Sequence, residues 1–314
     1  MQNIFGPGEF FVEDSVIDKF YNDTTVKNLD IDELNKDYIN QYTILRSQTD
    51  TKKTVVIKSI DRSLYKNVVP KTDLVVSGVS PRDVKQFMLL ESLQDSNTLM
   101  TIGLGQAGTG KSTIAMAYAL EDHFNTKRKI HLSKPTSLVG GTKSTFGPVP
   151  GDMGEKYAPH IQHFYCILED ILGSKSKNYL DVMKRDGKIN FTPIEYARGF
   201  TFKNCIFIVD EVQNLTWHEL KTISSRMGEN SKLILLGDLA QIDRKYSLQD
   251  SGIYNMISSD KFKKSSLTSC IYLTEQYRSP LATLIADIDD DKRTRENKSK
   301  GTVRKRNTSN TKTV

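Results

Sequence analysis

The chain has 314 residues, 37% of them hydrophobic, which is enough for one large domain with additions. Its formal net charge is +6, but residues 292–314 alone hold nine Lys or Arg and one acid, so the remainder is close to neutral. The three cysteines, Cys166, Cys205 and Cys270, form no CxxC pair, which argues against a zinc or disulfide framework. No apolar run reaches membrane-spanning length and no signal-peptide pattern is found, so we expect a cytoplasmic protein with no membrane partner.

The first 79 residues carry no chemical motif. Residues 1–37 are interpreted as an N-terminal extension of unknown role, and 38–79 as a small β-rich lead-in. Within the lead-in, the β-branched runs 41–47 and 54–60 flank a polar turn and predict a hairpin, and 74–78 is a further candidate strand.

A helix is predicted to begin at Ser80, with Ser80 as its capping residue, Pro81 at the first helical position and Asp83 three residues after the cap. Gln86 on this helix precedes the phosphate loop described next. In many motor ATPases a Gln at this place reads the adenine edge by donating and accepting one hydrogen bond. A solvated Gln on an amphipathic helix is the alternative, and the choice of ATP over GTP depends on Gln86 alone.

The stretch 105–112, GQAGTGKS, fits the phosphate-binding pattern GxxxxGK[ST] at every fixed position. The apolar run 99–104 before it predicts a buried strand, and the run from Ser112 onward predicts a buried helix, which is the context that the pattern requires. The alternative is a glycine turn that matches by chance. We expect the loop and the helix start to hold the phosphates of a nucleotide through Gly105, Gln106, Ala107, Gly108, Thr109, Gly110, Lys111, Ser112 and Thr113.

The chemistry of this loop predicts ATP with Mg²⁺. Lys111 is a mobile cation that can reach the terminal phosphates, and the Ser112 hydroxyl can bind the metal. A second signal, about a hundred residues on, is the apolar strand 205–209 ending in Asp210 and Glu211. Asp210 is predicted to hold Mg²⁺, mostly through water, and Glu211 to polarise the attacking water. A capping box at Thr216 opens the next helix.

Three further segments carry candidate residues. The strand 128–135 leads into the glycine- and lysine-rich segment 140–152, where Lys143 and the glycines could follow a phosphodiester backbone, unless the segment is an ordinary exposed loop. The strand 231–237 ends in a polar tip whose Gln241 could sense the γ-phosphate or orient water. Arg278, after the strand near 269–273, could stabilise the phosphoryl transition state or only pair with Glu275.

Residues 154–172 are predicted to form a helix, and 289–314 a disordered basic tail that could hold polyanions or simply be solvated.

Several of these segments together resemble the PhoH family of P-loop ATPases: GQAGTGKS, FGPVPGD, IEYARGFTFKNCIFIVDEVQN and LILLGDLAQID. The resemblance runs over about residues 79–288, which we assign as one ATPase domain, 80–288. YTILRS and SPRDVKQ also resemble the lead-in of longer PhoH relatives that carry an N-terminal PIN nuclease, for which residues 1–35 offer neither room nor a carboxylate cluster.

The resemblance implies an α/β fold of the RecA-like P-loop NTPase type, with a mostly parallel sheet flanked by helices and related to the first motor domain of superfamily 1 helicases. It implies ATPase roles for Lys111, Ser112, Asp210, Glu211 and Gln241, and TEQYRSP resembles the segment whose Arg touches the γ-phosphate. Only 36 residues follow Arg278, so we expect either neighbouring copies in a ring, such as a hexamer, or an ATPase that does not translocate.

The expected partner is single-stranded nucleic acid, RNA rather than DNA, bound near Lys134 to Gly151. A bacteriophage member of the family, working in the host cytoplasm, would suit the small size. Two other classes stay open: a nucleotide-gated regulatory module with slow hydrolysis, and a small-molecule kinase, against which the acid pair Asp210 and Glu211 argues.

Overall fold

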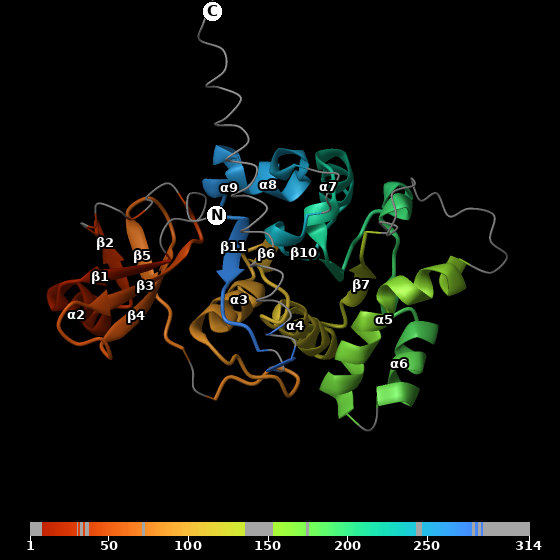
Figure 1. The fold of residues 1–314 in the computed structure, drawn as a ribbon, viewed down its shortest axis with the longest axis horizontal. Helices are drawn as coiled ribbons and strands as arrows, with labels where there is room; N and C mark the ends of the chain where they lie inside the picture. The colour runs from red at the N-terminus through yellow and green to blue at the C-terminus, as the bar shows by residue number, and fades with distance from the viewer. Residues whose placement is uncertain are drawn as a thin grey trace, which may run out of the picture. The chain divides into compact units, whose positions relative to one another are not determined.

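A computed structural model describes residues 8–29, 31, 34, 38–70, 73–135, 153–173, 176–242, 247–277, 280, 281 and 284. The chain divides into two units, residues 1–275 and 276–314. The first unit contains a five-stranded and a six-stranded sheet (Figure 1). None of the described helices is long and apolar enough to cross a membrane.

The six-stranded sheet has the order β11-β6-β10-β9-β7-β8, and every neighbouring pair is parallel. All six carboxyl ends therefore lie at one edge of the sheet. Strand β10 lies between β6 and β9, so the polar tip after β10 is next to both the phosphate loop and the acid pair. The strands are β6 (Met100–Gly105), β7 (Lys129–Ser133), β8 (Ile189–Phe191), β9 (Cys205–Val209), β10 (Lys232–Gly237) and β11 (Thr268–Leu273).

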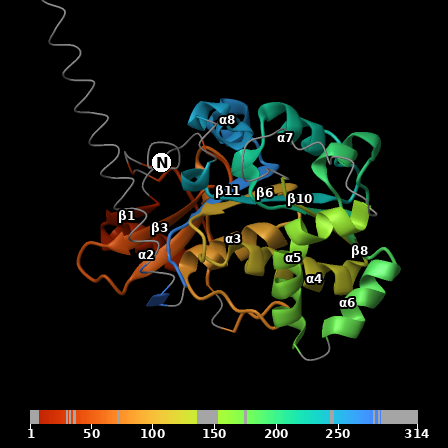
Figure 2. The ribbon, with the colours of Figure 1, turned by 45° about the vertical axis from the view of Figure 1, so that its right-hand side comes forward.

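Helices cover both faces of this sheet, and alternate residues of each strand point to one layer or the other. In β10, Ile234 and Leu236 join the core under the first helix layer, whereas Leu233 and Leu235 join the core under the second. Figures 1 and 2 show the two layers on opposite sides of the strands. The first layer contains α3 (Val84–Gln94), α4 (Lys111–Thr126), α5 (Met153–Leu172) and α6 (Ser176–Arg185); the second contains α7 (Trp217–Ser224), α8 (Gly252–Ser258) and α9 (Asp260–Lys263).

This arrangement confirms the predicted α/β fold with a mostly parallel sheet. The continuous apolar runs before the phosphate loop, before Asp210 and before Gly237 are all buried strands. Short 3₁₀ helices among the described residues connect the elements: η2 (Ile194–Gly199), η3 (Val212–Asn214), η4 (Leu239–Gln241) and η5 (Leu248–Asp250).

The five-stranded sheet has the order β1-β3-β4-β5-β2 and combines residues from both predicted N-terminal segments. The predicted hairpin is confirmed as β3 and β4, in which Tyr42 lies opposite Lys58. The candidate strand at 74–78 is wrong, because Val76 and Val79 form only an isolated bridge there, while β5 was not foreseen. The elements are β1 (Glu9–Val12), α2 (Asp14–Asn22), β2 (Thr25–Lys27), β3 (Tyr42–Ser47), β4 (Thr54–Ser59) and β5 (Leu64–Asn67).

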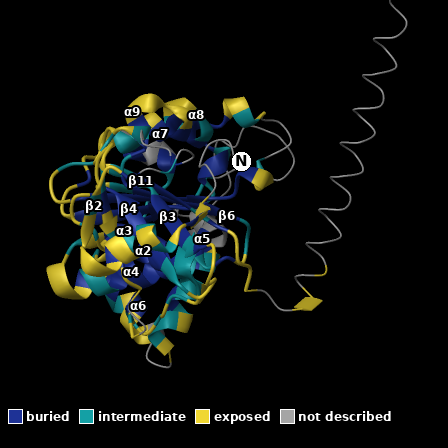
Figure 3. Ribbon diagram, turned by 90° about the vertical axis from the view of Figure 1, so that its left-hand side faces the viewer, coloured by how far each residue is buried: buried dark blue, intermediate teal, exposed yellow. Residues whose placement is uncertain are grey.

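The two faces of the five-stranded sheet pack against different cores. Leu45 points to the face covered by α2, where it meets Ile17 and Phe20. Ile44 points to the opposite face and joins the core under α3. Figure 3 shows β3, β4 and β6 as largely buried, with exposed residues on the outer helix surfaces and in connecting segments. The small sheet is thus continuous with the main core through one of its faces.

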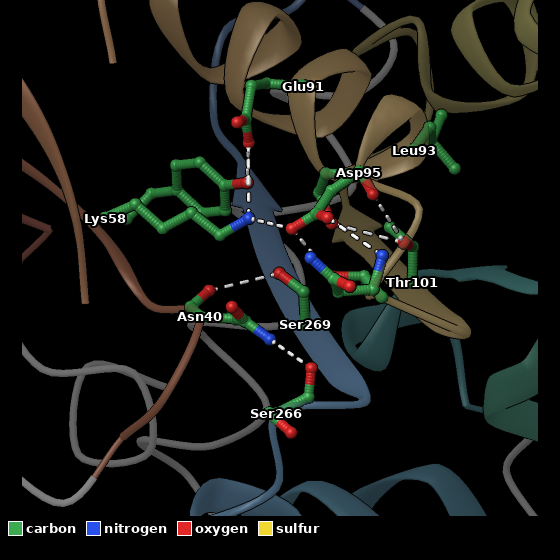
Figure 4. Close-up of polar contacts among 12 residues, drawn as sticks. Asn40, Lys58, Glu91, Leu93, Asp95, Thr101, Ser266 and Ser269 are labelled. Atoms are coloured by element: carbon green, nitrogen blue, oxygen red, sulfur yellow. Dashed lines mark hydrogen bonds and ion pairs between the residues drawn. The ribbon is translucent and has the colours of Figure 1, made fainter. Parts of the chain in front are cut away.

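A buried ion-pair cluster also joins the small sheet to α3, as Figure 4 shows. Lys58 of β4 has a side chain only 3% exposed, and its Nζ lies 2.5 Å from Asp95 and 3.5 Å from Glu91. The Tyr42 hydroxyl donates a hydrogen bond to Glu91. Burial raises the pKa of Asp95, but hydrogen bonds from Lys58 and the Asn97 amide outweigh it and hold the pKa below its usual range.

A second buried lysine binds backbone oxygens at the C-terminus of the same helix. Lys232, the first residue of β10, donates to the backbone oxygens of Leu93 and Asp95 at the C-terminus of α3, where a cation is favoured. On the other side of the junction, Asn40 donates to the Ser266 oxygen at 2.8 Å, and Ser269 donates to the Asn40 oxygen at 3.1 Å. We call the set Asn40, Tyr42, Lys58, Glu91, Asp95, Lys232 and Ser269 the junction cluster.

At its other end, α3 begins later than the sequence predicts. The capping residue is Asp83 and not Ser80: the Asp83 carboxylate accepts hydrogen bonds from the amides of Lys85 and Gln86. Asp83 has an extended backbone with φ −145°, as a capping residue requires. A carboxylate also interacts more favourably than a hydroxyl with the helix dipole, which explains the later start.

Candidate functional site

A cleft of about 280 Å³ opens at the carboxyl edge of the six-stranded sheet. It brings together residues from three predicted motifs and from α5, although these lie far apart in the sequence. The lining residues are Ala107, Gly108, Gly110, Lys111, Ser112, Thr113, His163, Ile167, Asp210, Glu211, Gly237, Asp238 and Gln241. Gly105, Gln106 and Thr109 of the predicted set lie in the same loop and contact Lys111 instead of lining the cleft.

The phosphate loop depends on glycine at two positions. A Cβ on Gly105 would lie 2.3 Å from the Leu273 oxygen of the neighbouring strand. Gly110, with φ +83°, precedes α4 in the left-handed region, and a Cβ there would lie 2.6 Å from Gln86 Nε2. Neither approach tolerates a side chain, so the loop can turn tightly between β6 and α4.

Lys111 folds back over its own loop. Its Nζ donates to the oxygens of Gly105 at 2.6 Å and Gln106 at 2.8 Å, and to Thr109 Oγ1 at 3.3 Å. Two of these acceptors are neutral carbonyl groups, and one is a hydroxyl. A phosphate oxygen carries a full negative charge and is a stronger acceptor, so Lys111 can exchange these contacts for a phosphate.

Gln86 braces this loop from α3. Its side chain is buried, with Nε2 donating to the Thr109 oxygen at 3.0 Å and Oε1 accepting from the Arg82 amide at 2.8 Å. The alternative of a solvated Gln is therefore wrong, because burial and two hydrogen bonds fix the amide. Both ends of the amide are bonded within the chain, so adenine reading by Gln86 stays a prediction.

Asp210 is the buried carboxylate of the cleft and lies directly after β9. Its Oδ2 accepts hydrogen bonds from Ser112 Oγ at 2.9 Å and His163 Nε2 at 3.2 Å, and its Oδ1 accepts from the Glu211 amide at 2.9 Å. Burial raises the pKa of Asp210, but these hydrogen bonds outweigh it and lower the pKa below its usual range. Asp210 is therefore a carboxylate beside the first turn of α4.

Glu211 is held in an unusual backbone conformation. Its φ of 58° and ψ of 36° lie in the left-handed region, which costs a residue with a Cβ about 1 kcal/mol. Gln213 Nε2 donates to Glu211 Oε2 at 2.5 Å, and Lys134 Nζ lies 3.6 Å from Oε1. The strained backbone and these two contacts fix the carboxylate at the cleft.

Gln213 links two strand ends and was not foreseen from the sequence. It is 1% exposed, and its Oε1 accepts from the Asp238 amide at 3.1 Å while its Nε2 reaches Glu211. A Cβ on Gly237 would lie 2.7 Å from Gln213 Oε1, so glycine makes room for this link. The sequence did offer a signal for this residue. The side chain of a Gln two residues after Glu211 has both a hydrogen-bond donor and an acceptor, and can therefore bridge two groups.

His163 was also missed, and no sequence pattern pointed to it. It reaches the cleft because α5 places Phe164 and Leu168 in the core, and His163 and Ile167, one turn apart, against the cleft. The contact between His163 and Asp210 joins residues 47 positions apart. Only the packing of α5 reveals it.

The remaining predicted residues differ in what the structure says of them. Gln241 lines the cleft from the exposed turn η4, near the Asp238 that caps that turn. The capping box of Thr216 and Glu219 is confirmed at the start of α7. Lys143, Arg278 and residues 289–314 lie outside the described residues, so their roles stay predictions.

The cleft fits a nucleotide with a divalent ion. The glycines let the loop turn tightly before α4. The backbone amides at the start of a helix are donors suited to a phosphate. Ser112 Oγ and Asp210 Oδ2 are hard oxygen donors beside it, suited to Mg²⁺. Within the described part of the chain, no group of three or more His, Cys, Asp or Glu side chains could hold a metal ion.

A comparison with known protein families shows which family the chain belongs to. The model of the family described as PhoH-like protein matches residues 78–289. The chain belongs to the PhoH-like protein family. Its cleft, phosphate loop and acid pair are accordingly those of a P-loop nucleotide-binding protein of the ATPase type.

Curated relatives agree with this assignment. The chain is 30% identical over 289 residues to Protein PhoH2 of Bacillus subtilis, covering 90% of this chain and 64% of that protein. It is 33% identical over 169 residues to Protein PhoH of Escherichia coli K12, covering 53% of this chain and 46% of that protein. The PhoH-like chain thus spans about half to two thirds of the length of these relatives.

Among solved structures, Pif1 helicase from Candida albicans matches 63% of this chain and 41% of its own chain, with 16% identity and a TM-score of 0.34. The fold of the PhoH-like chain is assigned on its own strand order and on the family match.

Proposed function

We propose that this PhoH-like protein binds ATP together with Mg²⁺ in the cleft and hydrolyses the γ-phosphate. The observation that carries the proposal is the placement of Glu211 opposite the phosphate loop, fixed by Gln213 and Lys134 and adjacent to the Ser112–Asp210 pair. A phosphate-binding loop alone serves many reactions. A fixed carboxylate beside it is the group that hydrolysis needs, because water must lose a proton as it attacks.

Each side chain then has a defined task. Lys111 leaves the loop oxygens and pairs with the terminal phosphates, and Glu211 accepts a proton from the attacking water. Ser112 and Asp210 hold the metal, which when bound neutralises charge that develops on the phosphate oxygens. Gln241 contacts the terminal phosphate from the tip of β10, and Arg278 adds a cation to the transition state.

The proposed partner is a single-stranded nucleic acid, RNA in preference to DNA. Lys134 supports this part of the proposal, because it follows β7 at the same edge as the cleft and opens the segment 134–151. The basic residues 292–314 add charge that attracts any polyanion.

Neighbouring copies of the chain, arranged as a ring, are proposed to complete the site. Size measurement with and without ATP tests the ring.

The decisive experiment measures phosphate release from ATP and Mg²⁺, with and without single-stranded RNA and DNA. We expect one polymer to stimulate release severalfold, and Glu211→Gln to abolish release while ATP still binds. Glu229→Gln is the matched control, since Glu229 is exposed and lies outside the cleft. Absence of hydrolysis in the wild type, with ATP bound, would refute the proposed ATPase. Unwinding is refuted separately if hydrolysis proceeds without strand separation.

A second candidate is a nucleotide-gated regulatory module with slow hydrolysis. The contact between Lys134 and Glu211 favours it, because Lys134 Nζ lies 3.6 Å from Glu211 Oε1 and competes with water for that oxygen. Slow phosphate release that neither polymer changes would select this candidate.

A further inference from the structure

The cleft contains a nitrogen donor that P-loop chemistry with Mg²⁺ does not require. His163 Nε2 lies 3.2 Å from Asp210 Oδ2, the same carboxylate oxygen that Ser112 Oγ contacts at 2.9 Å. A nitrogen and a hydroxyl oxygen therefore both lie within hydrogen-bond distance of one carboxylate oxygen. The side chain of His163 is 32% exposed and that of Asp210 is 11% exposed, so the group is accessible from the cleft.

The fold holds His163 in this position. On α5 the adjacent Phe164 is fully buried, and Leu168 is 1% exposed, which fixes the rotation of the helix. The neighbouring face then carries His163 and Ile167 into the cleft wall. The imidazole also lies against the Phe164 ring, with centroids 3.9 Å apart. Its approach to Asp210 is thus a consequence of core packing and not of a mobile surface side chain.

Asp210 supplies oxygen donors for a cation. Hydrogen bonds from Ser112 Oγ and the Glu211 amide orient its two oxygens at the cleft. An imidazole beside a carboxylate and a hydroxyl gives a mixed nitrogen and oxygen donor set. Mg²⁺ and Ca²⁺ prefer oxygen donors alone, whereas first-row transition ions accept imidazole and gain affinity from it.

We propose that His163 Nε2 is a ligand of the nucleotide-associated metal ion, so that this site takes a first-row transition ion such as Mn²⁺ in preference to Mg²⁺. The inference rests on the proposed function, because nucleotide phosphates and Ser112 supply the other ligands. Ligation at Nε2 requires the imidazole hydrogen to be on Nδ1. The hydrogen bond to Asp210 and the bond to the metal therefore replace one another at Nε2.

The test uses Mn²⁺ and ADP with the full chain, read by pulsed electron paramagnetic resonance and by titration calorimetry. We expect a ¹⁴N coupling to Mn²⁺ in the wild type that is lost in His163→Leu and His163→Gln. We also expect these variants to lose about tenfold in Mn²⁺ affinity with little change for Mg²⁺, a loss typical of a removed metal-site contact. His218→Gln is the matched control, because His218 is exposed on α7 and should leave both readouts unchanged.

The outcomes separate this inference from the proposed function. A wild type that binds Mn²⁺ and ADP without ¹⁴N coupling, or with a coupling that persists in both variants, overturns the assignment of His163 and leaves the ATPase standing. An unchanged ratio of Mn²⁺ to Mg²⁺ affinity in both variants overturns it as well. Failure of the wild type to bind any nucleotide refutes the proposed function and this inference together.

Discussion

The cleft and the junction cluster contain the same kinds of charged side chain, but arrange them differently. In the junction, Lys58 is 3% exposed and lies against two carboxylates, Asp95 and Glu91. In the cleft, Lys111 contacts two backbone oxygens and a hydroxyl of its own loop. The buried Lys58 is thus paired with carboxylates, whereas the loop contacts of Lys111 are with neutral oxygens that a phosphate can replace.

This difference shows how burial and partner type assign a role to a lysine. A buried pair stabilises only when both charges are present, because removal of one leaves the other unpaired in a poorly solvated place. A lysine bonded to neutral oxygens keeps most of its attraction for an anion. The same residue type is therefore structural in the junction and available for binding in the cleft. The two regions should respond oppositely to substitution.

The largest effect is expected for Lys111→Ala. The variant should lose phosphate release by on the order of 10²–10³-fold, because the cation that stabilises the terminal phosphates is gone. Its melting temperature without nucleotide should stay close to that of the wild type, since the contacts described for Lys111 are to neutral groups of its own loop. Phosphate release and thermal unfolding measure the two quantities. A large fall in melting temperature would show that Lys111 is structural and would erase the contrast with Lys58.

The opposite pattern is expected for Lys58→Met. Loss of the cation leaves Asp95 and Glu91 without their partner, which should reduce the free energy of unfolding by about 3–5 kcal/mol. ATP affinity of the folded fraction should change little, because Lys58 is outside the cleft. Urea unfolding provides the measurement, and Lys52→Met, at an exposed turn, is the control. A variant as stable as the wild type would show that the buried pair contributes nothing.

A smaller effect on catalysis is expected for Gln213→Leu. The side chain holds Glu211 but touches no substrate, so it is a positioning residue. We expect kcat to fall about 10–100-fold with ATP affinity nearly unchanged, because a misplaced base slows the proton transfer and not the binding. Gln213→Glu keeps the acceptor for the Asp238 amide and should lose kcat as well. Equal losses in affinity and kcat would indicate a general disruption of the cleft instead.

A pH-dependent effect is expected at Lys232. Burial lowers the pKa of Lys232 to about 8 from its ordinary value of 10.5. Between these two values the unfolded chain binds more protons than the folded chain, so the free energy of unfolding should rise with pH through that window. Relative to Lys232→Met, the wild type should gain on the order of 2 kcal/mol. Urea unfolding at pH 7.5 and pH 10 tests this, and parallel pH profiles would contradict the lowered pKa.

The smallest effect is expected at Gln86, which lies at the opposite end of α3 from the junction. If Gln86 acts only through the loop, Gln86→Ala should weaken ATP and GTP binding equally, by about fivefold for one lost hydrogen bond. A loss confined to ATP would instead establish adenine reading. Competition binding with the two nucleotides distinguishes these outcomes.

The sequence predicted the parts of the fold that are encoded locally. The phosphate loop has fixed spacing, and β6, β9 and β10 are continuous apolar runs, so their positions could be found without a structure. The hairpin of β3 and β4 was found for a similar reason, by its β-branched runs around a polar turn. The proximity of the motifs followed from one rule: parallel strands bring their carboxyl ends to one edge.

The parts that depend on tertiary packing could not be found in this way. Strand β1 pairs with β3, whose sequence is more than thirty residues away, and β1 is only four residues long. His163 reaches the cleft through the packing of α5, and Gln213 in η3 contacts the Asp238 amide at the end of β10. The start of α3 was misplaced because Asp83 was interpreted as an acid inside the first turn, whereas its extended backbone and the hydrogen bonds that it accepts from two amides make it the capping residue.

The position of β6 in the sheet has a consequence during synthesis on the ribosome. Thr101 of β6 lies opposite Ile234 on one side and Ser269 on the other, so both neighbouring strands are made well over a hundred residues later. At ordinary translation rates this leaves an apolar strand without its sheet partners for on the order of 10 s. The strand that carries the phosphate loop is therefore a segment of the nascent chain that a chaperone can protect.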